Sequence, residues 1–143
     1  MNFSYPIVLT PDENGTIMVR FPDVPEAFTC GRTKSEALLM AQDALHVAFT
    51  AYMKDNQDIP KPSKSKKGQP TVLLSPLVIA KLEIYQTLKT QGVTEIELAS
   101  RLHCDLRYIR RLLDLDHSTR LDHLEAALSE LGKRIVLTVM DAA

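Results

Sequence analysis

The chain has 143 residues, enough for one generous domain or two small ones, and 45% of them are hydrophobic and 24% charged, as in ordinary globular proteins. No apolar stretch approaches the roughly 20 residues of a membrane span, and the N-terminus lacks the pattern of a signal peptide, so we expect a cytoplasmic protein with no membrane partner. The net charge of −1 hides an asymmetry: residues 1–58 carry 4 Lys and Arg against 8 Asp and Glu, whereas residues 59–143 carry 13 against 10. This difference indicates either separate partners for the two halves or ordinary scatter between small domains.

Residues 5–31 have the pattern of short β-strands. Residues 5–10 are rich in β-formers, and residues 17–21 place alternate apolar side chains on one face. Between them, Asn14-Gly15 can form a tight hairpin turn. Two prolines interrupt the regular pattern over residues 21–25, and a short strand around residues 28–30 is predicted to end at Gly31.

A long amphipathic helix is predicted after these strands. Thr33 and Glu36 have the spacing of a capping box, which fixes where the helix begins. Apolar side chains then recur at the three- and four-residue spacing of a helix packed on a sheet, at Ala37, Leu38, Ala41, Ala44, Leu45, Ala48, Phe49 and Tyr52. The pattern ends near Asp55.

A connector rich in Pro, Ser, Gly and Lys follows, and residues 59–70 are predicted to form an exposed loop. Residues 71–74 read as a short buried strand that returns to the first sheet. We therefore expect residues 1–74 to form an α+β domain, with a small antiparallel sheet and one helix.

Residues 75–143 have the pattern of a mainly helical domain. Ser75-Pro76 opens a helix that closes at Gln91-Gly92. Thr94 with Glu97, and then Asp105, begin two short helices, and Ser118-Thr119-Arg120 is predicted to cap another with Leu121, Leu124, Leu128 and Leu131 as its core. Residues 134–140 alternate like a short β-strand, and a second copy of the chain is the natural partner for that strand, in a dimer or a tetramer.

The two short helices have the features of a DNA-binding helix-turn-helix. Ala99 is the small residue that a tight helix crossing needs, and Ile96, Leu98 and Leu102 are its apolar neighbours. The second helix exposes arginines that could read guanine or bind phosphate in the major groove of duplex DNA, although a solvated basic helix face is the alternative. The candidate DNA contacts are Glu95, Leu106, Arg107, Tyr108, Arg110, Arg111, Thr119 and Arg120.

Residues 93–132 resemble the lambda-repressor-like helix-turn-helix family. The resemblance rests on Thr94, Glu97-Leu98-Ala99, Leu102, Ile109 and Leu131-Gly132. It implies that Leu106, Arg107 and Arg111 contact bases and that Glu95 lies near a phosphate. The family commonly has Gly in the turn where this chain has His103, and histidine tolerates the left-handed conformation better than most residues.

Residues 5–60 resemble the HicB antitoxin family. The most specific element is Phe21-Pro22-Asp23-Val24-Pro25, followed by Thr29-Cys30-Gly31-Arg32-Thr33 and Glu36-Ala37. The resemblance implies a partial ribonuclease-H-like first domain that neutralises HicA, a small cationic ribonuclease toxin that cleaves mRNA. It also implies a C-terminal domain that binds operator DNA and represses the protein's own operon.

The loop of residues 21–26 is the expected toxin contact, because a loop fixed by prolines loses little entropy on binding. The candidate contacts are Arg20, Phe21, Pro22, Asp23, Val24, Pro25, Glu26, Phe28 and Arg32. In the alternative interpretation, the prolines only shape a sheet edge and the two phenylalanines belong to the core.

Other functions are less well supported by the residues. The carboxylates of the first half are scattered over turns, a loop and helix positions, which does not suit two-metal nuclease chemistry. Cys30 and Cys104 have no neighbours at metal-ligand spacing. We therefore expect no catalytic residues, no metal and no cofactor. A stand-alone transcriptional regulator, with a first domain that senses a ligand or a protein, remains the alternative to an antitoxin.

Overall fold

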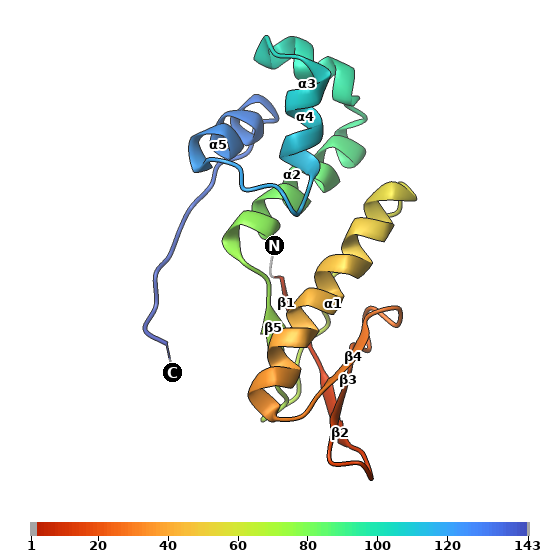
Figure 1. Ribbon diagram of the computed structural model, residues 1–143. Helices are drawn as coiled ribbons and strands as arrows, with labels where there is room; N and C mark the ends of the chain where they lie inside the picture. The colour runs from red at the N-terminus through yellow and green to blue at the C-terminus, as the bar shows by residue number, and fades with distance from the viewer. Residues whose placement is uncertain (1–2, 143) are drawn as a thin grey trace. The chain divides into compact units, whose positions relative to one another are not determined.

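A computed structural model describes residues 3–142, and the chain divides into an N-terminal unit, Met1–Ile79, and a C-terminal unit, Ala80–Ala143. The N-terminal unit contains five strands and one long helix within its described residues (Figure 1). These elements are β1 (Ser4–Pro6), β2 (Val8–Pro11), β3 (Ile17–Arg20), β4 (Phe28–Gly31), α1 (Lys34–Lys54) and β5 (Thr71–Leu73). The mixed α+β class predicted from the sequence is confirmed.

The strands form two small antiparallel sheets, with the orders β2-β3-β4 and β1-β5. The single strand predicted over residues 5–10 is therefore wrong: the chain changes its pairing partner at Ile7, whose N–H donates to the carbonyl of Pro70 at 3.0 Å. Residues before Ile7 pair with β5, and those after it pair with β3. Alternating hydrophobicity predicts which face of a sheet a residue occupies, but it does not predict which strand the residue pairs with.

Helix α1 lies along the strands and supplies much of this unit's core (Figure 1). The Thr33 hydroxyl accepts a hydrogen bond from the N–H of Glu36 at 3.1 Å, as the predicted cap requires. Gly31 sits where β4 meets the start of α1, and a Cβ added there would lie 2.5 Å from the backbone nitrogen of Ala37. The buried face of the helix consists of Ala37, Ala41, Leu45, Ala48 and Phe49.

The connector of residues 59–70 is fastened to the N-terminal unit more firmly than its composition predicts. Ile59 is only 5% exposed, so the expectation of a wholly exposed loop is wrong at its start. The Tyr5 hydroxyl donates to the carbonyl of Pro60 at 2.6 Å, and Asp23 accepts hydrogen bonds from the N–H and the hydroxyl of Ser63 at 2.9 and 3.0 Å. The prolines reduce the entropy lost when such a segment is fixed. Its four lysines are exposed as expected, at Lys61, Lys64, Lys66 and Lys67.

The helices of the C-terminal unit match the predicted order. They are α2 (Pro76–Gln91), in which the unit boundary falls, α3 (Glu95–Leu102), α4 (Leu106–Leu113) and α5 (Leu121–Glu130). Helix α3 packs against both α4 and α5. Buried apolar side chains of this core include Leu82, Ile84, Leu98, Ile109, Leu112, Leu124, Leu128 and Leu131.

Three predictions about this unit are corrected. Ile96 and Leu121 were expected in the core, but they are 71% and 52% exposed because each lies in the first turn of its helix, on a side without a packing neighbour in this unit. Residues 133–142 leave α5 as an extended chain without strand pairing (Figure 1). A strand needs a neighbouring strand for its backbone hydrogen bonds, and residues 134–140 have no such neighbour within the described chain. Pairing with a second copy stays a prediction.

Membrane insertion by a helix is not supported by the structure. Within residues 3–142, no helix combines the length and the apolar character that crossing a bilayer requires.

The close approach at Gly31 predicts that Gly31→Ala destabilises the N-terminal unit. The added methyl group must displace the backbone at the start of α1, and such overpacking costs about 1–3 kcal/mol of unfolding free energy. Urea denaturation followed by circular dichroism measures this loss, with Ser35→Ala as an exposed control in the same turn. Equal stability of the wild type and the Gly31 variant would contradict the packing described.

Candidate nucleic-acid interface and partner surface

Helix α4 is amphipathic, with one buried side and one basic side. Asp105 begins the helix, and its carboxylate accepts a hydrogen bond from the N–H of Tyr108 at 2.9 Å. Ile109 and Leu112 are buried on one side. The opposite side exposes three arginines, and within residues 3–142 no ion pair joins them to a carboxylate: Arg107, Arg110 and Arg111. These guanidinium groups can therefore bind an anionic partner.

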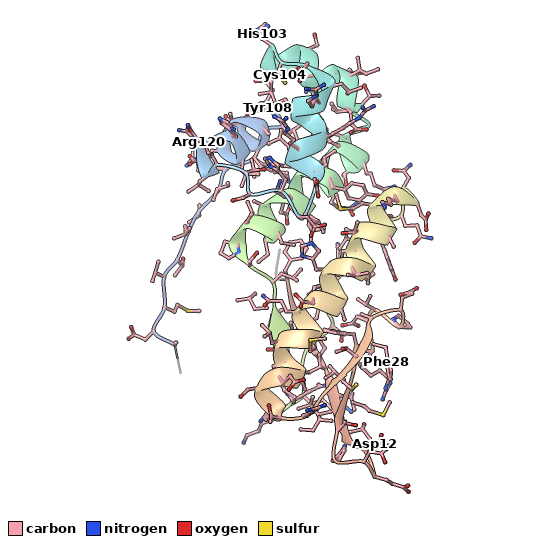
Figure 2. The ribbon with its side chains drawn as sticks, in the orientation of Figure 1. Asp12, Phe28, His103, Cys104, Tyr108 and Arg120 are labelled. Atoms are coloured by element: carbon pink, nitrogen blue, oxygen red, sulfur yellow. The ribbon has the colours of Figure 1, made fainter. Side chains whose placement is uncertain are left out.

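The turn between α3 and α4 depends on an unusual backbone conformation. His103 has φ 53° and ψ 45°, which confirms the left-handed conformation expected at this position. The N–H of Cys104 donates to the carbonyl of Ala99 at 3.0 Å, so the last carbonyls of α3 are satisfied by the turn. Ala99 is itself buried, as predicted for the helix crossing. Figure 2 shows His103 and Cys104 at this turn.

Three of the candidate DNA contacts, Tyr108, Thr119 and Arg120, make contacts within the chain (Tyr108 and Arg120 are labelled in Figure 2). The Tyr108 ring lies 5.3 Å, centroid to centroid, from the ring of His123 on α5, and burial raises the pKa of Tyr108. The Arg120 guanidinium donates to both carboxylate oxygens of Asp122, at 3.1 and 2.9 Å. Of the other candidates, Glu95 is exposed in the first turn of α3 and Leu106 is half-buried.

Thr119 is part of a polar cluster around the buried Lys81 that the sequence did not predict. The Nζ atom of Lys81 donates to the Thr119 hydroxyl and to the carbonyl of Arg111, each at 2.6 Å. The predicted cap of α5 is wrong in detail, because Arg120 precedes the helix and makes no capping bond with its side chain. The burial of Lys81 could not be predicted from the sequence, since lysine is almost never fully buried and this one interrupts an ordinary apolar pattern.

The predicted toxin contacts in the loop of residues 21–26 do not form one exposed set. Phe21 and Val24 are both 0% exposed, so these two side chains belong to the core and leave the candidate surface. The alternative interpretation, in which both phenylalanines belong to the core, therefore holds for Phe21 and is wrong for Phe28, which is 56% exposed. Asp23 binds Ser63, and Glu26 accepts a hydrogen bond from the Tyr52 hydroxyl at 2.7 Å, which lowers the pKa of Glu26.

Two of the remaining candidates, Arg20 and Phe28, lie on the face of the β2-β3-β4 sheet that α1 leaves open. Arg20 is paired with Phe28 across β3 and β4, and with Val8 across β2 and β3, so these three side chains form a row on one face. Phe28 is 56% exposed and lies on the side of β4 away from α1 (Figure 2). The other exposed candidates are Pro22, Pro25 and Arg32.

The described residues bring no acidic or metal-binding centre together. Among residues 3–142, no three side chains of His, Cys, Asp or Glu gather where they could hold a metal ion.

Comparison with known proteins identifies the class to which the chain belongs. Residues 4–83 match a family model described as a HicB-like antitoxin of a bacterial toxin-antitoxin system. A protein named Antitoxin HicB 2 of Photorhabdus laumondii is 40% identical over 97% of the chain and 98% of its own length. Antitoxin HicB of Escherichia coli K12 is 37% identical over 95% of the chain and 99% of its own length. The crystal structure of the N-terminal domain of Burkholderia pseudomallei antitoxin HicB matches half of the chain and 95% of that domain, with 18% identity and a TM-score of 0.43.

The chain is thus an antitoxin of the toxin-antitoxin class, and these relatives are named as antitoxins and not as enzymes. It belongs to the HicB-like antitoxin family. The resemblance of the first half to this family is confirmed.

The left-handed residue in the α3–α4 turn predicts that His103→Gly stabilises the C-terminal unit. Glycine adopts this conformation without the steric cost that a Cβ imposes, so the free energy of unfolding should rise by about 0.5–1 kcal/mol. Thermal denaturation measures the change. His103→Ala is the matched control, because it removes the same imidazole and keeps the Cβ. Equal gains in both variants would show that the side chain, and not the backbone, sets the stability of this turn.

Proposed function

We propose that the C-terminal unit is a helix-turn-helix domain that binds operator DNA and represses the protein's own operon. The observation that carries this proposal is the exposed arginine face of α4, which is held by α3 through the left-handed turn at His103. An eight-residue helix with a buried apolar side and an unpaired basic side has the shape and charge to enter the major groove. Arg107, Arg110 and Arg111 supply the bidentate donors for guanine or phosphate.

The N-terminal unit is proposed to bind a small basic ribonuclease toxin of the HicA type. Membership of an antitoxin family implies a toxin partner and favours this function over a stand-alone regulator. An RNA-cleaving enzyme presents a basic face to its substrate, and the acidic residues 1–58 are suited to cover such a face. The open sheet face around Arg20 and Phe28 offers an aromatic contact beside polar neighbours, which is typical of protein interfaces.

Self-association is proposed through residues 134–140. Val136, Val139 and Met140 are 80%, 85% and 82% exposed, and the alternating segment has unpaired backbone groups. Pairing with the same segment of a second chain would satisfy that backbone and cover these side chains. A dimer presents two copies of α4, as binding to paired operator half-sites requires.

For the DNA surface, Arg107→Ala or Arg111→Ala should weaken binding to the protein's own upstream DNA by roughly 5- to 100-fold, since one good arginine–base contact is worth about 1–3 kcal/mol. Fluorescence anisotropy with a labelled duplex measures the affinity. Arg101→Ala is the matched control, because Arg101 is an exposed arginine on α3 that lies 3.9 Å from Glu97. The wild-type affinity should also fall steeply with salt, since phosphate contacts release counterions.

Two outcomes of this experiment would refute the DNA proposal. One is a flat salt response of the wild-type protein. The other is an equal loss of DNA and toxin binding in the α4 variants, because α4 belongs to the C-terminal unit and toxin binding is assigned to the other unit.

For the toxin surface, Arg20→Ala together with Phe28→Ala should abolish copurification with a coexpressed basic toxin of the HicA type. The change removes the aromatic contact and the neighbouring arginine side chain from the centre of the open sheet face. Coexpression and affinity capture measure the effect, with Lys34→Glu as an exposed control on the same unit. Operator binding should stay within about twofold of the wild type. Undiminished copurification would show that the toxin does not bind at Arg20 and Phe28.

A further inference from the structure

Lys81 is a fully buried lysine in the C-terminal unit. Its side chain lies in α2 and is 0% exposed. One hydrogen bond from Nζ reaches the carbonyl of Arg111 at 2.6 Å, and another reaches the Thr119 hydroxyl at 2.6 Å. Thr119 also donates to the Arg111 carbonyl at 3.4 Å and lies 3.0 Å from Nδ1 of His117. A single amine therefore connects α2, the last turn of α4 and the segment that leads into α5.

The burial of this amine is costly, and stability alone does not explain it. Burial lowers the pKa of Lys81 to about 8, and the negative charge of Asp114 opposes that shift only in part. A well-packed apolar side chain at such a position usually serves stability as well as a buried charge or better. The amine instead fixes the relative positions of two segments, because its hydrogen bonds are directional and join the Arg111 carbonyl to the Thr119 hydroxyl.

These acceptors lie at the end of the basic helix. Arg111 is in the last turn of α4, where the helix dipole favours a cation, and its carbonyl also accepts a hydrogen bond from the N–H of Asp114 at 3.3 Å. Lys81 binds this carbonyl from the inside of the unit, while the Arg111 side chain is exposed outside it. Lys81 thus binds the backbone of Arg111, and the side chain of Arg111 is proposed to contact DNA.

We infer that Lys81 is a positioning residue for sequence-specific DNA binding, which it supports by holding the C-terminal turn of α4 and the Thr119 segment in a fixed arrangement. The inference rests on the proposed binding of operator DNA by α4. Phosphate contacts tolerate small shifts of a helix, whereas bidentate contacts to bases do not. Loss of the Lys81 bonds should therefore reduce the preference for the correct sequence more than the affinity for DNA in general.

The binding experiment compares two duplexes, one from the region directly upstream of the protein's own coding sequence and one with the same bases shuffled. Lys81→Met should lower the affinity ratio between them by about tenfold, with little change in binding to the shuffled duplex or in the salt dependence of that binding. Thr119→Val should have the same effect, and Thr119→Ser, which keeps the hydroxyl, should retain the wild-type ratio. A purely structural role would lower the fraction of folded protein and leave the ratio unchanged. If Thr119 instead contacts phosphate, Thr119→Val weakens both duplexes equally, which overturns the inference.

Amide hydrogen exchange provides a test without DNA. In Lys81→Met, the amides of residues 110–120 should exchange about tenfold faster, while those of α3 keep their wild-type rates. Unchanged exchange in residues 110–120 overturns the inference whether or not the protein binds DNA. A wild-type protein that does not distinguish the two duplexes refutes the proposed operator binding, and with it the DNA role of Lys81. If Lys81→Met does not fold, the Thr119→Val and Thr119→Ser pair decides both tests.

Discussion

The packing of α1 on the strands is the constraint on which the N-terminal unit depends. Small residues at Ala37, Ala41 and Ala48 let the helix approach the sheet closely, and Gly31 removes the side chain that would obstruct its first turn. With one helix on one side, the opposite face of the β2-β3-β4 sheet stays open within the described chain, and the row of Val8, Arg20 and Phe28 occupies it. The same packing that builds the core thus defines the surface offered to a partner.

In the C-terminal unit, the short helix α4 is held in place mainly by contacts at its two ends. An eight-residue helix has little stability of its own, so its position depends on its neighbours. At its start, Asp105 caps α4 directly after the turn at His103. At its end, Lys81 binds the carbonyl of Arg111. Both ends are fixed by polar contacts, and the apolar side rests on Ile109 and Leu112.

The sequence predicts the elements well and the tertiary contacts of polar side chains poorly. Helix starts at Thr33, Thr94 and Asp105 follow from local chemistry, because a cap joins residues three positions apart. The change of partner at Ile7 and the burial of Lys81 depend on residues far away in the chain, which no local pattern encodes. Two candidate contacts are also engaged within the chain: Phe21 lies in the core, and Arg120 is paired with Asp122 two residues away, although each has a residue type suited to binding.

The uncovered apolar segment at the C-terminus has a consequence for how the protein responds to its own abundance. In a single chain, the side chains of Val136, Val139 and Met140 remain in water, so the free energy of burying them is gained only in an assembly. By mass action, an assembled form gains stability as the protein becomes more abundant. If the assembled form is the one that represses, synthesis falls as the antitoxin accumulates, and residues 134–140 couple transcription to protein concentration without any small-molecule signal.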